Sequence, residues 1–85
     1  MSNDGSVVRS TVIEILRRNG SEVSGQDGKA DMFLILKGEV YEILAIPETC
    51  GRRLVHYLSR KFKTPIHHFY NPLMAPSLPG EDSPQ

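Results

Sequence analysis

Two segments of the chain have the apolar spacing of amphipathic helices. In the first, apolar residues recur three or four positions apart, as in a helix with one buried stripe: Val8, Val12, Ile15 and Leu16. We expect Ser6 to cap this helix and Asn19-Gly20 to end it, because glycine adopts the left-handed C-terminal conformation without steric cost.

The second helical segment has its apolar stripe at Leu54, Val55, Leu58 and Phe62. Thr49 is the expected cap at its start. Thr64-Pro65 is the expected end, since the residue before a proline avoids helical geometry.

Between these helices lie two β-rich runs, at residues 32–36 and 40–46, joined by Lys37-Gly38-Glu39. A glycine flanked by polar residues between two such runs predicts a β-hairpin. A short strand is also expected at residues 22–24, and residues 66–70 are β-rich enough to predict a third or edge strand.

The order helix, two strands, helix, with a terminal strand after it, predicts an α+β fold of one small domain. Two helices would pack on one face of a small antiparallel sheet. The domain is expected to span residues 6–70. Residues 71–85 contain four prolines and predict a disordered, proline-rich tail.

A resemblance rests on four stretches between residues 11 and 63. They are a helix ending in Ile15-Leu16-Arg17-Arg18-Asn19-Gly20, a loop with Gly28-Lys29, a strand pair ending at Ile46-Pro47, and a closing basic helix. This layout resembles the bacterial HicA family, small messenger-RNA-cleaving toxins with a double-stranded-RNA-binding-domain-like fold. That family has its catalytic histidine at the start of the first strand, where this chain has Gly28-Lys29-Ala30-Asp31. The resemblance therefore implies a nuclease-inactive copy that keeps the shape and RNA contact.

Ten basic and ten acidic residues cancel over the whole chain, but they are not evenly distributed. Residues 48–68 have five bases and one acid, residues 1–47 have five bases and seven acids, and the tail has two acids. The basic segment predicts phosphate contact as an alternative function, near His67, His68 and Tyr70. The other interpretation is a solvated helix whose cations favour its C-terminal end. The candidate nucleic-acid-binding residues are Arg52, Arg53, Arg60, Lys61 and Lys63.

Composition narrows the remaining chemistry. With 39% apolar residues and balanced charge, the chain is not expected to be wholly disordered. No segment is apolar enough to span a membrane, and the N-terminus lacks a signal-peptide pattern. One cysteine permits no internal disulfide. We therefore expect a cytoplasmic or nuclear protein that is not secreted.

No recognised catalytic or metal-ligand spacing is present, so we expect no catalytic residue, metal or cofactor. His67 and His68 would point to opposite faces of the predicted strand. Cys50, expected beside Arg52 and Arg53 at the start of the second helix, has two interpretations. It is either a thiol of lowered pKa and raised reactivity, or a small structural residue.

The leading functional hypothesis is a non-enzymatic interaction or regulatory module that works as a dimer or as a subunit of a complex. An apolar sheet surface would form the contact, because so short a chain with such apolar strands leaves one sheet face uncovered. A one-residue shift in register would exchange core and interface positions. The candidate interface residues are Phe33, Ile35, Tyr41, Ile43, Phe69 and Tyr70.

Overall fold

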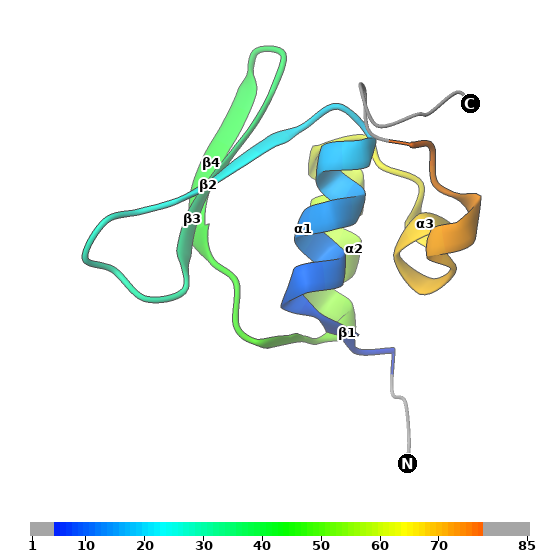
Figure 1. Ribbon diagram of the computed structural model, residues 1–85, viewed down its shortest axis with the longest axis horizontal. Helices are drawn as coiled ribbons and strands as arrows, with labels where there is room; N and C mark the ends of the chain where they lie inside the picture. The colour runs from blue at the N-terminus through cyan, green and yellow to red at the C-terminus, as the bar shows by residue number, and fades with distance from the viewer. Residues whose placement is uncertain (1–4, 78–85) are drawn as a thin grey trace, which may run out of the picture.

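The computed structural model describes residues 5–77 of the 85-residue chain, so the predicted tail from residue 78 onward lies outside the described part (Figure 1). A three-stranded antiparallel sheet has the order β2-β3-β4, and β1 pairs with β5 in a separate two-stranded ladder. The described residues confirm a small α+β domain. Its elements are β1 (Val7–Val8), α1 (Arg9–Arg18), β2 (Glu22–Gly25), β3 (Met32–Lys37), β4 (Val40–Ala45), β5 (Thr49–Cys50), α2 (Arg52–Lys61), α3 (Ile66–Tyr70) and the 3-10 turn η1 (Pro72–Met74).

Helices α1 and α2 lie side by side against one face of the three-stranded sheet, and α3 lies on their far side (Figure 1). Both long helices start at the end of the molecule where β1 pairs with β5, and they run in the same direction (Figure 1). The predicted arrangement of two helices on one face of an antiparallel sheet is confirmed. Within residues 5–77, no helix lies against the opposite sheet face (Figure 1).

The core lies between this sheet and the helices. Its residues are almost completely removed from solvent, and the predicted stripes of both helices contribute to it, except for Val8, which was expected in the first stripe but lies exposed in β1. From the sheet come Val23 and Ile35, and from α3 comes Phe69. The helical residues of the core include Val12, Ile15, Leu16, Val55 and Leu58, followed by Phe62 after the end of α2.

The predicted hairpin is confirmed as β3 and β4, and the short strand expected at residues 22–24 is confirmed as β2. In the hairpin, Lys37 pairs with Val40, so only Gly38 and Glu39 form the turn. Gly38 has φ +63°, which glycine adopts without the clash that a Cβ would bring.

The two predicted helix caps are wrong for one shared reason. Helix α1 begins after Val8 and α2 after Gly51, neither with a side-chain cap, so Ser6 and Thr49 cap nothing. Instead, Val8 pairs with Thr49 in the β1–β5 ladder, and the Arg9 amide donates to the Glu48 carbonyl over 2.9 Å. Strand pairing thus occupies the segments where caps were expected.

The predicted strand at residues 66–70 is also wrong, because this segment forms α3. The His68 amide donates to the Pro65 carbonyl over 3.0 Å, and Phe69 is buried against the core. Burial of one aromatic side chain outweighs the β-propensity of the segment. The chain then continues into η1, which lies within the range expected as tail, and Ala75 packs against the core.

Candidate binding surface of strand β4 and helix α2

The register of the sheet assigns each side chain of β3 and β4 to one of two faces. Ile35 pairs with Glu42 on the face toward the helices, and Leu34 pairs with Ile43 on the opposite one, which we call the outer face. Tyr41 and Ile43 on this face are 64% and 50% exposed. The apolar side chains of the outer face are Met32, Leu34 and Leu36 from β3, and Tyr41, Ile43 and Ala45 from β4.

Strand β4 is an edge of the sheet, and alternate residues direct their main-chain groups away from β3. The Ile46 amide donates to the Asp31 carbonyl over 2.7 Å, which sets the alternation of bonded and non-bonded pairs along the ladder. It follows that Tyr41, Ile43 and Ala45 point their N–H and C=O groups outward. Within residues 5–77 these groups have no hydrogen-bond partner, and we call this row the β4 edge.

The other edge of the sheet, β2, is partly covered. On the β2–β3 side, the Gln26 amide donates a hydrogen bond to the Met32 carbonyl, which makes the Val23–Ile35 pair a non-bonded one. The Val23 carbonyl therefore points outward, away from β3. The Arg17 guanidinium donates to this Val23 carbonyl over 2.8 Å. A side chain of α1 thus occupies the β2 edge, whereas the β4 edge is open to strand pairing.

A groove of about 750 Å³ lies between β4 and α2, and we call it the α2 groove. Its helical residues share one face of α2, because Arg53 precedes His56 and Tyr57 by three and four positions, and Arg60 follows Tyr57 by three and His56 by four. Arg53 and Arg60 form no ion pair among the described residues. The lining residues are Val40, Arg53, His56, Tyr57, Arg60 and Lys61.

Glu42 lies beside this groove and binds two of its residues. Tyr57 donates its hydroxyl to the Glu42 carboxylate, and Lys61 Nζ lies 3.2 Å from Glu42 Oε1. The hydrogen bond from Tyr57, followed by that from Lys61, lowers the pKa of Glu42. The same carboxylate raises the pKa of Tyr57 and of Lys61. The negative charge of Glu42 therefore offsets the positive charge of Lys61. Within residues 5–77, Arg53 and Arg60 are the cations of the groove that form no ion pair.

The predicted nucleic-acid-binding residues divide between the groove and its surroundings. Arg53, Arg60 and Lys61 line the groove, while Lys63 lies beyond the end of α2 and Arg52 lies against Gly5. Sequence reasoning missed His56 and Tyr57 as part of this surface. Their helical spacing from the two arginines was the available signal.

The predicted interface residues divide in the same way between core and surface. Tyr41 and Ile43 lie on the outer face, and Tyr70 is exposed on α3, where its hydroxyl donates to the Gly5 carbonyl over 2.6 Å. Ile35 and Phe69 are buried in the core, and Phe33 packs against it.

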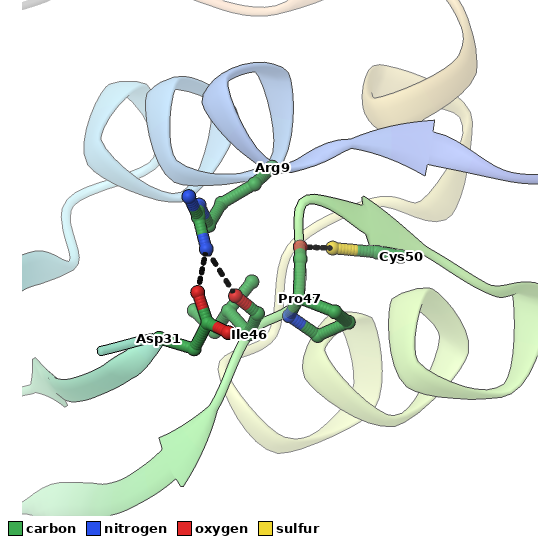
Figure 2. A network of polar contacts seen from close by, with 5 residues as sticks. All are labelled: Arg9, Asp31, Ile46, Pro47 and Cys50. Atoms are coloured by element: carbon green, nitrogen blue, oxygen red, sulfur yellow. Dashed lines mark hydrogen bonds and ion pairs between the residues drawn. The ribbon is translucent and has the colours of Figure 1, made fainter. Parts of the chain in front are cut away.

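Arg9 joins α1 to both ends of the β3–β4 hairpin (Figure 2). Its guanidinium donates to the Asp31 carboxylate and, over 2.9 Å, to the Ile46 carbonyl, and it lies 5.6 Å from the centre of the Phe33 ring. Asp31 has φ +65°, a backbone conformation rare outside glycine. It belongs to the stretch where the HicA resemblance places a histidine, and its carboxylate is held in this ion pair.

Of the two interpretations of Cys50, a reactive thiol or a small structural residue, its surroundings favour the structural one. It lies in β5, fully buried, with Sγ 3.6 Å from the Pro47 carbonyl oxygen (Figure 2). Burial raises the pKa of the thiol, and the opposing effect of the Arg9 charge is smaller. Cys50 does lie at the start of α2, directly before its first flanking residue Gly51, but the lowered pKa of the reactive interpretation is wrong.

The two adjacent histidines lie on α3, so the prediction that they point to opposite faces of a strand is wrong. Their rings make an edge contact with centres 4.7 Å apart, and His68 Nδ1 lies 3.3 Å from Asn19 Nδ2. Among residues 5–77, no three His, Cys, Asp or Glu side chains gather closely enough to hold a metal ion. The helices of the same range are too short and too polar to cross a bilayer.

Comparisons with protein-family models, with curated proteins and with solved structures find no match to this chain. Functional inference therefore rests on the surface formed by the outer face, the β4 edge and the α2 groove.

Proposed function

We propose that this domain is a non-enzymatic interaction module that works as a subunit of a complex by binding a partner protein through the outer face and the β4 edge. The observation that supports this proposal is that strand β4 exposes both its side chains on one face and its main-chain groups along one edge. Tyr41, Ile43 and Ala45 present apolar side chains on the outer face and outward main-chain groups on the edge. A partner strand gains main-chain hydrogen bonds and apolar contact at the same residues.

A different protein fits this surface better than a second copy of the chain. Antiparallel pairing of two β4 edges about a two-fold axis would bring two α2 grooves together on the same side of the joined sheet. Arg53 and Arg60 of each copy would then approach those of the other. Like charges at an interface oppose association, so charge favours a partner of another sequence.

The test is reconstitution of a complex from purified components. A partner recovered with the full chain from its native cells is purified and its binding is measured with the wild-type chain, Ile43→Asp and Leu73→Asp. We expect Ile43→Asp to abolish binding and Leu73→Asp to preserve it, because Leu73 is exposed on η1, outside this surface. A reconstituted partner that binds Ile43→Asp as well as wild type would contradict the proposal, as would a strictly monomeric chain without any reconstituted partner.

Nucleic-acid contact is a second candidate, favoured by the gathering of Arg53, Arg60 and Lys61 with His56 and Tyr57 in one groove. In such a groove the cations can bind phosphates, while the aromatic ring beside them can stack on bases. The HicA resemblance belongs to this candidate, and the absence of a histidine at residues 28–31 limits it to binding without cleavage.

A fluorescence titration against a structured RNA at two salt concentrations tests this candidate. We expect affinity that falls with salt, because bound phosphates release counterions, and that is lost in Arg53→Glu/Arg60→Glu. The matched control is Lys29→Glu, a charge reversal in the exposed loop before β3. Affinity that is absent or independent of salt would exclude it.

A further inference from the structure

We infer that the β4 edge and the α2 groove together bind an extended peptide segment whose side chains alternate between apolar residues and a spaced pair of acids. The inference rests on the proposed function and names the chemistry of the partner. It combines two independent features of the described residues: a row of main-chain groups without hydrogen-bond partners, and beside it the two arginines Arg53 and Arg60, which form no ion pair there.

The main chain of β4 fixes the first half of the site. A strand added antiparallel to β4, with bonded pairs at Tyr41, Ile43 and Ala45, would form roughly six main-chain hydrogen bonds, two for each pair. Its side chains opposite these residues lie on the outer face, beside Tyr41 and Ile43. Apolar side chains suit these positions because cross-strand apolar pairs stabilise a sheet.

The intervening side chains of the added strand lie on the other side, toward the α2 groove, opposite Val40, Glu42 and Leu44. Strand β4 and helix α2 run in opposite directions (Figure 1). Lys61 contacts Glu42 near the end of α2, and Val40 lines the groove with both Arg53 and Arg60. Because the strand and the helix run in opposite directions, Arg60 lies toward the Val40 end of the added strand and Arg53 toward its Leu44 end.

Spacing supports the match between the two rows. Arg53 and Arg60 are seven positions apart on the helix, about 10 Å along its axis. Val40 and Leu44 are four positions apart on the strand, about 13 Å. Long arginine side chains span the difference, so two acids four residues apart on the added strand can each meet one guanidinium.

Glu42 makes the central position different from the two outer ones. An acid directly opposite Glu42 would meet a carboxylate that Tyr57 and Lys61 hold in its charged form. Like charges directly across a strand pair are destabilising, so a neutral side chain such as threonine is preferred there. The expected pattern is acid, apolar, neutral, apolar, acid.

A peptide explains this surface better than a nucleic acid for two reasons. The β4 edge presents alternating N–H and C=O groups, which a peptide main chain matches and a phosphate backbone does not. The Glu42 carboxylate beside the groove opposes a continuous row of phosphates, whereas a peptide can place its acids on either side of it.

The test measures peptide binding to the full chain by fluorescence anisotropy, with Glu-Val-Thr-Val-Glu as the probe segment within a neutral flanking sequence. We expect about tenfold weaker binding when both Glu are replaced by Lys, and also when alternate peptide amides that face β4 are N-methylated. Replacing the central Thr by Glu should weaken binding, and Glu42→Gln should remove most of that loss. N-methylation changes only the peptide, so its effect does not depend on the folding of a variant.

Protein variants supply the matching set. Arg53→Glu/Arg60→Glu should lose binding of the acidic peptide and gain the Lys-substituted one, while Lys29→Glu should leave both unchanged. Equal binding of acidic and basic peptides, or no effect of N-methylation, would overturn the inference. Tighter binding of structured RNA, lost in the double variant, would also overturn it and assign the groove to nucleic acid.

Failure of this inference and failure of the proposed function give different results. If the probe peptide does not bind, but Ile43→Asp abolishes binding of a reconstituted partner, the proposed interaction function stands. The inference that the partner supplies an acidic strand is then wrong. If neither peptide nor partner binds, the proposed function falls as well.

Discussion

Ile35 and Ile43 show, at the residue scale, how register alone separates core from surface. They lie on neighbouring strands and face opposite sides of the sheet, with Ile35 fully buried and Ile43 half exposed. We expect Ile35→Ala to lower the free energy of unfolding by about 3 kcal/mol, because it removes buried methyl groups and leaves a cavity. The same change at Ile43 should cost well under half as much. Urea denaturation of both variants measures the difference, and equal losses would contradict the assigned register.

Glu42 predicts a pH dependence at the same scale. Its pKa is lowered in the folded state by Tyr57 and then Lys61, so it stabilises the fold above its unfolded pKa. This stabilisation is lost as the pH falls through the folded pKa, below the usual range of a glutamate. We expect the difference in unfolding free energy between wild type and Glu42→Gln to shrink between pH 6 and pH 3. Glu39→Gln, in the exposed hairpin turn, is the matched control, and a constant wild-type–Glu42→Gln difference across this range would contradict the prediction.

At the scale of elements, helix α3 depends on one of its two adjacent aromatic residues. Phe69 is buried in the core and Tyr70 is exposed. We expect Phe69→Ala to lower the free energy of unfolding by about 3 to 5 kcal/mol. For Tyr70→Phe, which removes only the hydroxyl bond to Gly5, we expect about 1 kcal/mol or less. Thermal unfolding followed by circular dichroism compares them, and a mild Phe69→Ala would mean that α3 is not anchored as described.

The elements predictable from sequence were those whose signal lies within one segment. The spacing of Val12, Ile15 and Leu16 defines a helix without reference to the rest of the chain, and Gly38 between two apolar runs defines a turn. Helix α3 was missed because its conformation depends on where Phe69 is buried, which a segment alone cannot show.

The candidate surface was predictable in the same partial way. The outward side chains of Tyr41 and Ile43 follow from alternation along a strand once the register is known. The register itself, and with it the placement of Phe33 and Ile35 toward the helices, depends on contacts between strands. The α2 groove needed the packing of α2 beside β4, which no spacing in the sequence encodes.

At the scale of the whole molecule, Cys50 reports on the integrity of the fold. It is the single cysteine of the chain and is fully buried in β5. We expect its labelling by a thiol reagent at pH 8 to be at least about a hundredfold slower in native protein than in 8 M urea, because reaction requires opening of the core. Phe69→Ala should speed native labelling, and Tyr70→Phe should change it little. Rapid labelling of the native wild-type protein would contradict the burial of Cys50.

The β1–β5 ladder has an electrical consequence for the whole molecule. By joining the starts of α1 and α2, it makes their dipoles point the same way, so the negative C-terminal ends of both helices lie at one end of the domain. The last turns of both helices are basic there: Arg17, Arg18, Arg60 and Lys61. These cations offset the two aligned dipoles, and salt would weaken this compensation in both helices at once.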